Sequence, residues 1–290
     1  MATHNTILVT GANGQLGKEF QALAALYPQY HFLFATRDVI AIEDAESVKK
    51  YFADNTIDYC VNCAAYTAVD KAETESDAAF LINATAVGNL AAVCASHKTQ
   101  LIHISTDYVF DGTGKHPYKE TDPTNPVSIY GQSKLQGEQL AVQNNPAVII
   151  IRTSWVFSSF GNNFVKTMLR LMKERESVNV VDDQLGCPTY AADLATCIME
   201  IIEKCSMLNV QYPIFNYCNE GVINWYQFAL AIKEFAGSAC AVNPIPSSQY
   251  PTPVKRPQYS ALDTTKIKEA LGITIPGWRE SLEKCLALIK

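Results

Sequence analysis

The chain has 290 residues, of which 48% are hydrophobic and 18% are charged, and its formal net charge is −6. These values are typical of a soluble globular protein with a large core and one or two domains. They argue against a general nucleic-acid or anionic-membrane binder, since both require a basic surface.

Residues 1–5 lack the basic and apolar regions of a signal peptide, and no apolar run approaches the roughly 20 residues of a membrane span, so we expect neither feature. The nine cysteines show no disulfide pattern, which predicts a reduced, cytoplasmic protein. Cys60 and Cys63 have the spacing of a redox or zinc pair, but no second pair exists and residues three apart on a strand face opposite ways. We interpret them as buried small residues and expect no metal.

The first half of the chain alternates short apolar runs with amphipathic stretches. The apolar runs predict strands and the amphipathic stretches predict helices. Such alternation is typical of an α/β fold, a doubly wound parallel sheet of Rossmann type with helices on both faces. The predicted strands are 6–10, 31–36, 57–64, 100–105 and 147–152, and the predicted helices include 44–52, 77–96 and 130–143.

The alternation loosens in the second half, where we expect a strand at 178–181, an extended segment at 213–217 and a helix at 224–235. Residues 243–257 hold five of the thirteen prolines, which excludes a helix or a central strand and favours a loop over a ligand, or else a passive surface linker. We therefore predict a dinucleotide-binding domain over 1–158, with a further strand and helix near 178–204. A smaller, mainly substrate-binding domain is predicted over 159–290.

Three glycines follow the first predicted strand, at Gly11, Gly14 and Gly17, and a helical stretch follows them. A strand, a glycine turn and a helix form a corner where a pyrophosphate can lie against free N–H groups at the helix N-terminus. The spacing is Gly-x-x-Gly-x-x-Gly, so the usual Gly-x-Gly-x-x-Gly fingerprint of dehydrogenases is not met. Plain turn glycines are the alternative.

Ser105 and Thr106 end the fourth predicted strand, where ligands bind in open parallel sheets. Tyr130 and Lys134 are four residues apart at the start of a predicted helix, so both side chains reach one cleft. A nearby lysine charge is expected to draw the phenol pKa down from its usual value near 10. Such a pair also arises by chance in many proteins, and the glycine corner together with the Ser105 and Thr106 hydroxyls favours a catalytic role.

These residues resemble the extended short-chain dehydrogenases/reductases that act on nucleotide sugars. Longer runs are similar to the dTDP-4-dehydrorhamnose reductases in particular, and the similarity extends over nearly the whole chain. The runs are 62–73, 105–112, 152–156, 161–164, 183–189 and 250–257.

The resemblance implies reduction of the 4-keto group of dTDP-4-dehydro-L-rhamnose to dTDP-L-rhamnose with NADPH or NADH. It makes Tyr130 the proton donor, Lys134 its activator and ribose ligand, and Thr106 a hydrogen-bond partner of the reacting oxygen. Arg37 favours the 2′-phosphate of NADPH, whereas the adjacent Asp38 leaves use of both cofactors open. Related enzymes often carry an acidic residue a little further on, and residues 39–42 depart from that pattern.

The resemblance also implies two sets of binding residues. Trp155 would offer a flat indole face to the sugar, and Asn163 and Arg256 would bind the diphosphate. The cofactor set is Gly11, Asn13, Gly14, Gln15, Leu16, Gly17, Thr36, Arg37, Ala64, Ala65, Tyr66, Thr67, Asn83, Tyr130 and Lys134. The substrate set is Thr106, Asp107, Tyr130, Trp155, Asn163 and Arg256.

Two other functions stay open at this point. A dehydratase or epimerase of the same superfamily is one, although dehydratases carry Asp-Glu after the threonine and this chain has Asp107-Tyr108. A non-catalytic subunit similar to the regulatory subunit of methionine adenosyltransferase is the other. We expect a dTDP-sugar as the partner, no nucleic acid or membrane, and a homodimer as the candidate assembly.

Overall fold

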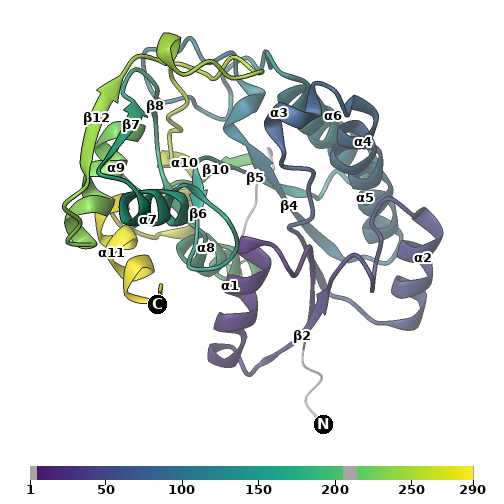
Figure 1. Ribbon diagram of the computed structural model, residues 1–290. Coiled ribbons are helices and arrows are strands. Elements are labelled where there is room, and N and C mark those ends of the chain that lie inside the picture. The colour runs from purple at the N-terminus through teal and green to yellow at the C-terminus, as the bar shows by residue number, and fades with distance from the viewer. Residues whose placement is uncertain (1–4, 205–213, 290) are drawn as a thin grey trace.

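The computed structural model describes residues 5–204 and 214–289 and contains a six-stranded parallel sheet (Figure 1). Its strand order is β10-β5-β4-β3-β1-β2. This confirms the α/β prediction and the five strands expected in the first half. The strands are β1 (Asn5–Thr10), β2 (Tyr30–Ala35), β3 (Tyr59–Asn62), β4 (Gln100–Thr106), β5 (Ile149–Thr153) and β10 (Ile214–Asn216).

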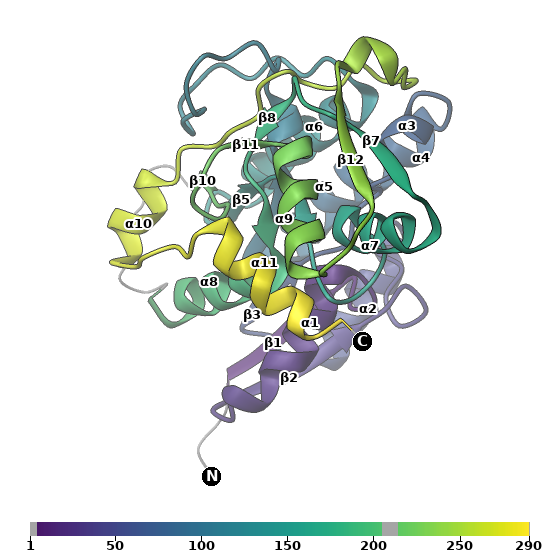
Figure 2. The same ribbon diagram turned by 60° about the vertical axis from the view of Figure 1, so that its left-hand side comes forward.

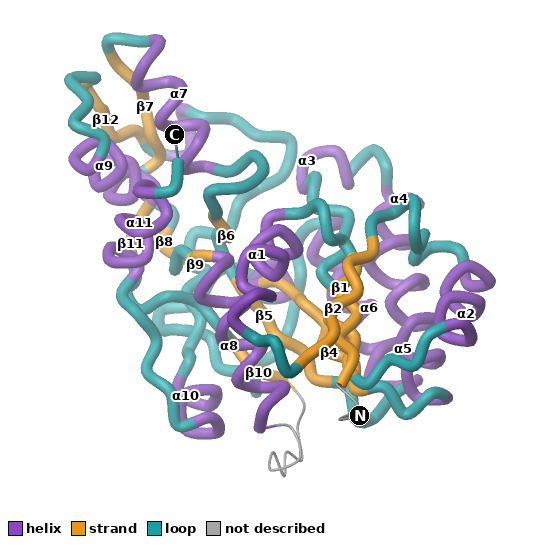
Figure 3. The backbone as a smooth tube through the Cα atoms, turned by 90° about the horizontal axis from the view of Figure 1, so that it is seen from below, coloured by secondary structure: helices purple, strands orange, loops and turns teal. Residues whose placement is uncertain are grey.

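Helices cover both faces of this sheet (Figure 3). Because successive strand residues face opposite ways, Ile7 of β1 packs on one side of the sheet and Leu8 packs on the other. The first side holds α1 (Gln15–Leu23), α8 (Ala191–Lys204) and α10 (Thr265–Leu271). The second side holds α2 (Ala45–Asp54), α5 (Ala86–Ser96) and α6 (Ile129–Asn144).

A long helical segment runs from Ser76 to Ser96 and comprises α4 (Ser76–Phe80), a π-helical turn (Leu81–Thr85) and α5. By length and composition it is apolar enough to cross a membrane, so the expectation that no run approaches such a length is wrong. More than half of its most apolar window is buried against the rest of the protein. The apolar character therefore matches a helix that packs in a core.

The C-terminal part forms a second unit with its own apolar cluster, which includes Phe157, Phe228 and Leu282. It contains α7 (Phe164–Glu174), α9 (Trp225–Phe235), α11 (Trp278–Ala287) and a parallel pair of strands, β7 (Ser177–Val181) and β12 (Ala241–Ile245) (Figure 2). Short strand pairs join β6 (Val156–Phe157) to β9 (Thr189–Tyr190) and β8 (Leu185–Gly186) to β11 (Ile223–Asn224).

Two segments belong to a different part of the fold from the one that the sequence pattern indicated. The strand expected near 178 pairs with β12 instead of joining the central sheet, whereas the helix that follows it, α8, does pack on that sheet. The extended segment expected at 213–217 supplies β10, the last strand of the central sheet, and its residue 213 lies outside the described residues, as do 1–4. Pro244 is tolerated in β12 because that sheet has two strands only, so β12 is an edge strand.

Candidate functional site

A cavity of about 680 Å³ lies at the carboxyl ends of β1, β3, β4 and β5, where they meet residues of the C-terminal unit. Fifteen of the expected site residues line it: Gly11, Asn13, Gly14, Gln15, Leu16, Gly17, Arg37, Ala64, Ala65, Thr67, Thr106, Asp107, Tyr130, Lys134 and Trp155. The structure places Thr36, Tyr66, Asn83, Asn163 and Arg256 outside this lining.

The glycine corner is packed too closely for side chains at two of its positions. Gly11 has a φ of +62°, and a Cβ there would lie 2.6 Å from the backbone nitrogen of Ala64. A Cβ on Gly17 would lie 2.6 Å from the carbonyl oxygen of Gly11. Gly14 caps the N-terminus of α1, whose first turn carries no acidic residue. The corner thus presents free N–H groups and a positive helix end to the cavity, which suits a pyrophosphate.

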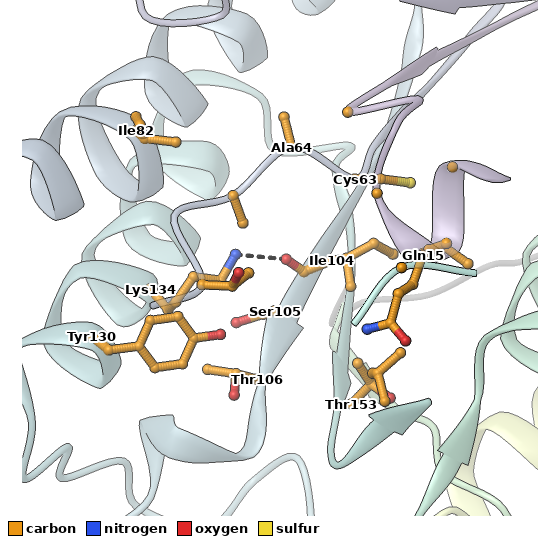
Figure 4. Close-up of a pocket in the computed structure, with 18 of the residues that line it drawn as sticks. Gln15, Cys63, Ala64, Ile82, Ile104, Ser105, Thr106, Tyr130, Lys134 and Thr153 are labelled. Carbon is orange, nitrogen blue, oxygen red and sulfur yellow. Dashed lines mark hydrogen bonds between the residues drawn. The ribbon is translucent and has the colours of Figure 1, made fainter. Parts of the chain in front are cut away.

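Helix α6 carries Tyr130 and Lys134 into the cavity opposite Ser105 and Thr106 of β4 (Figure 4). Ser128 begins this helix, because its hydroxyl accepts a hydrogen bond from Gly131 N at 3.1 Å. Lys134 is only 2% exposed, and its Nζ donates to the carbonyl oxygen of Ile104 at 2.7 Å. The predicted convergence of the phenol, the amine and the threonine hydroxyl is therefore present in the structure.

The protonation of the pair differs from the expectation. Burial raises the pKa of Tyr130 above its ordinary value, the Thr106 hydroxyl opposes that rise, and the Asp107 carboxylate adds to it. Burial lowers the pKa of Lys134 to about 8, against an opposing effect of Glu138. Burial is the largest influence on the Tyr130 pKa, and the lowering expected from Lys134 is not present in this structure. Burial thus favours the protonated phenol at neutral pH.

Thr106 and Asp107 form a polar pair at the end of β4. Thr106 Oγ1 donates to Asp107 Oδ1 at 3.0 Å and accepts from Tyr108 N at 3.2 Å. Burial raises the pKa of Asp107 to about 6, although several hydrogen bonds act in the opposite direction. Within the described part of the chain, Asp107 Oδ2 makes no well-aligned hydrogen bond, although the nearby Ser260 side chain favours the carboxylate and acts to lower its pKa. A buried carboxylate oxygen in the cavity wall that is only weakly engaged suits a donor group of a ligand.

A buried ion pair between Glu138 and Arg152, which the sequence did not reveal, contacts Ser105 through a hydrogen bond. Ser105 Oγ donates to Glu138 Oε1 at 2.5 Å, and Arg152 Nη2 lies 2.7 Å from Glu138 Oε2. Both charged side chains are 3% exposed. The one feature of the sequence that could have pointed to this ion pair is the spacing of Glu138, which lies one helical turn after Lys134 on α6.

Trp155 lies in the cavity wall, and one face of its indole is packed. The ring stacks on Trp225 with a centroid distance of 3.5 Å. A Cβ on Gly186 would lie 2.6–2.8 Å from Cε2, Cζ2 and Nε1 of the indole, so Gly186 packs closely against that side of the ring. The expectation that the remaining ring face meets the sugar stays a prediction.

Asn163 begins helix α7 and contacts the glycine corner indirectly. Its Oδ1 accepts from Lys166 N at 3.1 Å, and its Nδ2 donates to Gln15 Oε1 at 2.9 Å and to Ser158 O at 2.7 Å. The amide is thus already engaged within the protein, and Gln15 is the residue that reaches the cavity.

Asn83 and Tyr66 join the π-helical turn to the loop after β3. Asn83 Oδ1 accepts from Tyr66 N at 2.8 Å, and Asn83 Nδ2 donates to Tyr66 O and to Ser133 Oγ, both at 3.0 Å. The Tyr66 hydroxyl points away and donates to Glu75 Oε2 at 2.6 Å. These contacts hold the segment that carries Ala64, Ala65 and Thr67 against α6.

The two arginines expected to bind phosphate groups, one in the cavity lining and one outside it, form ion pairs. Arg37 pairs with Glu43, and both residues line the cavity. Glu43 follows directly after the 39–42 segment, and the sequence pattern did not indicate it as a site residue. Thr36, which precedes Arg37, does not line the cavity, and its carbonyl accepts the backbone N–H groups of residues 39 and 40. Arg256, from the proline-rich loop, pairs with Asp70 at 2.6 Å.

Cysteines and metal ligands contribute little to the site. Cys60 is buried as expected, but Cys63 is only partly buried and lines the cavity, and burial raises its thiol pKa. Over residues 5–204 and 214–289, no group of three or more His, Cys, Asp or Glu side chains could hold a metal ion.

Comparison with known proteins identifies the family. A family model described as the RmlD substrate binding domain matches residues 5–290. A dTDP-4-dehydrorhamnose reductase of Aggregatibacter actinomycetemcomitans is 42% identical over 291 residues, covering 97% of this chain and 98% of that protein. The solved dTDP-4-dehydrorhamnose reductase ortholog of Clostridium acetobutylicum is 38% identical, with a TM-score of 0.92 over 98% of this chain and 99% of that one. That of Bacillus anthracis, solved with NADP, is 36% identical with a TM-score of 0.93 over the same shares. The chain therefore belongs to the dTDP-4-dehydrorhamnose reductase family.

Proposed function

We propose that this chain reduces the 4-keto group of dTDP-4-dehydro-L-rhamnose to give dTDP-L-rhamnose, with NADPH or NADH as the reductant. The observation that carries the proposal is that the glycine corner and the Tyr130 hydroxyl line one cavity. A nicotinamide dinucleotide bound at that corner can reach the phenol, and family membership supplies the substrate class.

The residues present suit such a cofactor. Gly11 and Gly17 allow the tight corner that a pyrophosphate site requires, because any Cβ there would collide with backbone atoms of the chain. Arg37 is 76% exposed and can leave Glu43 for a 2′-phosphate, whereas Glu43 itself can accept from a ribose 2′-hydroxyl. These two residues support use of both cofactors. When bound, the nicotinamide supplies the hydride for the sugar C4.

Three side chains would then control transfer of a proton to the sugar C4 oxygen. Tyr130 holds its proton at neutral pH because burial raises its pKa, so the phenol can donate it to the alkoxide that forms at C4. Thr106 would turn its hydroxyl proton from Asp107 Oδ1 to the same oxygen and orient it toward the phenol. Lys134, beside them on α6, would bind the nicotinamide ribose and supply positive charge as the phenolate forms. Asp107 Oδ2 and Trp155 are the candidates for contacts with the sugar.

The test is to incubate the protein with dTDP-4-dehydrorhamnose and each reduced cofactor and to identify the sugar product. Reduced cofactor should be consumed in equal amount to the dTDP-L-rhamnose formed. Cofactor binding without consumption would instead favour the regulatory-subunit alternative. Conversion of the substrate to an isomeric keto-sugar without net cofactor use would favour an epimerase. A cytoplasmic location and a homodimer stay predictions of the sequence, and light scattering on the purified protein tests the second.

A further inference from the structure

His103 is a buried titratable residue to which the proposed reaction assigns no role. It lies in the middle of β4, is fully buried, and has a polar neighbour at each ring nitrogen. Its Nδ1 lies 3.1 Å from Nδ2 of Asn62 on β3, and its Nε2 lies 3.4 Å from Nζ of Lys134 on α6. A polar side chain in a buried strand position, with contacts at both nitrogens, calls for a physical reason.

The orientation of the Asn62 amide is determined by its other neighbours. Asn62 Oδ1 lies 3.2 Å from the backbone N–H of Ala64 and 2.7 Å from the Thr10 hydroxyl. Because a backbone N–H can only donate, the amide atom facing Ala64 must be the oxygen. A flipped amide would set its NH₂ group against that N–H. The NH₂ group of Asn62 therefore faces His103.

This orientation selects one tautomer of the imidazole. An NH₂ group can only donate, so Nδ1 of His103 must be the acceptor and carries no proton. Burial, with the neighbouring Lys134, holds the pKa of His103 well below its usual range, so the ring is neutral. A neutral ring without a proton on Nδ1 carries it on Nε2. That N–H points toward Nζ of Lys134.

An N–H aimed at Nζ distinguishes the two charge states of Lys134. A neutral amine has a lone pair that can accept from His103 while the amine donates to Ile104 O. An ammonium has only donors, so it would meet the imidazole N–H donor to donor.

Among the described residues, the charged group that acts on Lys134 is Glu138, one turn further along α6, and it favours the ammonium. Its carboxylate is already paired with Arg152 of β5 and hydrogen-bonded to Ser105 of β4. Tyr130, on the preceding turn of α6, stays uncharged at neutral pH because burial raises its pKa.

We propose that His103, held in the Nε2–H tautomer by Asn62 and Thr10, is a positioning residue that disfavours the charged form of Lys134. The chain of contacts spans the adjacent strands β1, β3 and β4 and ends on the amine of α6. The effect of His103 on turnover rests on the role proposed above for Lys134. The effect of His103 on the charge of the Lys134 amine does not depend on that role.

The tautomer can be read in the unmodified protein. Long-range ¹H–¹⁵N correlation spectra of the histidine side chains separate the two neutral tautomers, and assignment uses loss of one signal set in His103→Gln. The expected result is the Nε2–H pattern for His103 with no protonation down to the acid limit of folding. An Nδ1–H pattern would overturn the proposal.

The effect on the amine is measured by titrating the Lys134 ε-carbon signal in protein labelled with [ε-¹³C]lysine. Asn62→Asp places a carboxylate against Nδ1, which draws the proton to Nδ1 and leaves Nε2 as an acceptor for an ammonium. The midpoint of Lys134 should rise by about one pH unit or more. His103→Gln, which can turn its amide oxygen toward Nζ, should shift it in the same direction.

The matched control is His97→Gln, the same exchange at an exposed position after α5, which should leave the Lys134 midpoint unchanged. An unchanged midpoint in both Asn62→Asp and His103→Gln would contradict the proposal. Circular dichroism checks that each variant folds. If neither variant folds, the tautomer of His103 measured in the wild-type protein tests the proposal alone. Because neither spectrum uses the keto-sugar, a chain that fails to reduce it while showing these shifts would refute the proposed function and leave this inference standing.

Discussion

Lys134 Nζ donates a 2.7 Å hydrogen bond to the carbonyl oxygen of Ile104, and this bond ties helix α6 to strand β4 within the cavity wall. Ser105 and Thr106 follow Ile104 directly, so the bond also sets the separation between the phenol of Tyr130 and the hydroxyls opposite it (Figure 4). The Lys134 amine thus helps to fix the spacing of the site residues in addition to carrying its charge.

Replacing Lys134 by Met should damage both cofactor binding and catalysis. The change removes the cation and leaves a buried carbonyl without its partner, so we expect a weaker cofactor Kd and a fall in kcat/KM of about tenfold or more, the effect of about 1.4 kcal/mol. Lys204→Met is a matched control, because Lys204 Nζ donates to the Leu271 carbonyl at 2.8 Å far from the cavity. Equal kinetics in the two variants would argue against the role of Lys134.

Asp107 should make stability fall as the pH rises between about 4 and 6. The folded chain keeps the Asp107 proton to about pH 6, whereas the ordinary value is 3.8, so the folded state binds more protons in that window. Asp107→Asn removes this cost and should stabilise the protein at pH 7 by at most about 3 kcal/mol, with no gain below pH 4. Urea unfolding over pH 3.5 to 8 measures it, with the exposed Asp54→Asn as the control. A gain that does not vary with pH would count against this account.

Gly186→Ala should disturb the sugar end of the cavity. The new Cβ would lie 2.6 Å from the Trp155 ring, which also stacks on Trp225, so the indole must shift. We expect a higher KM for the sugar, an altered tryptophan emission and an unchanged cofactor Kd. Gly277→Ala is the control, since a Cβ there meets nothing within 4 Å. An unchanged emission spectrum would mean that Gly186 does not pack against the ring as described.

Arg37→Ala should change cofactor preference. If the guanidinium binds a 2′-phosphate, its loss should weaken NADPH by at most a few kcal/mol, the range for hydrogen bonds to charged groups, and leave NADH nearly unaffected. Asp38→Ala should act in the other direction. The ratio of kcat/KM for the two cofactors measures the change, with Lys49→Ala on α2 as a surface control. Equal losses for NADH and NADPH would show that Arg37 does not read the phosphate.

The sequence predicted those parts of the site that depend on local periodicity. The glycine turn, the end of β4 and the i, i+4 pair of Tyr130 and Lys134 are each set within a few residues, and the parallel sheet brings strand ends together. The cavity lining could be anticipated for that reason.

The remaining features arise from contacts between distant segments. The packing of Gly186 against Trp155, the pairing of β7 with β12, and the burial of Tyr130 all depend on tertiary packing. His103 gave one local hint, a polar residue within an apolar strand, but its partners Asn62 and Lys134 come from other elements. Charge and burial at such positions become visible only once the fold is known.

The proton donor is the central claim, and Tyr130→Phe tests it most directly, because the change removes one hydroxyl and leaves the ring that packs against Tyr108. Single-turnover reduction of dTDP-4-dehydrorhamnose should be measured beside the cofactor Kd in the wild type and the variant. The account predicts an unchanged Kd and a rate lower by about 10²–10⁴-fold, the share that a general acid contributes. A rate near that of the wild type, with the cofactor still bound, would contradict it.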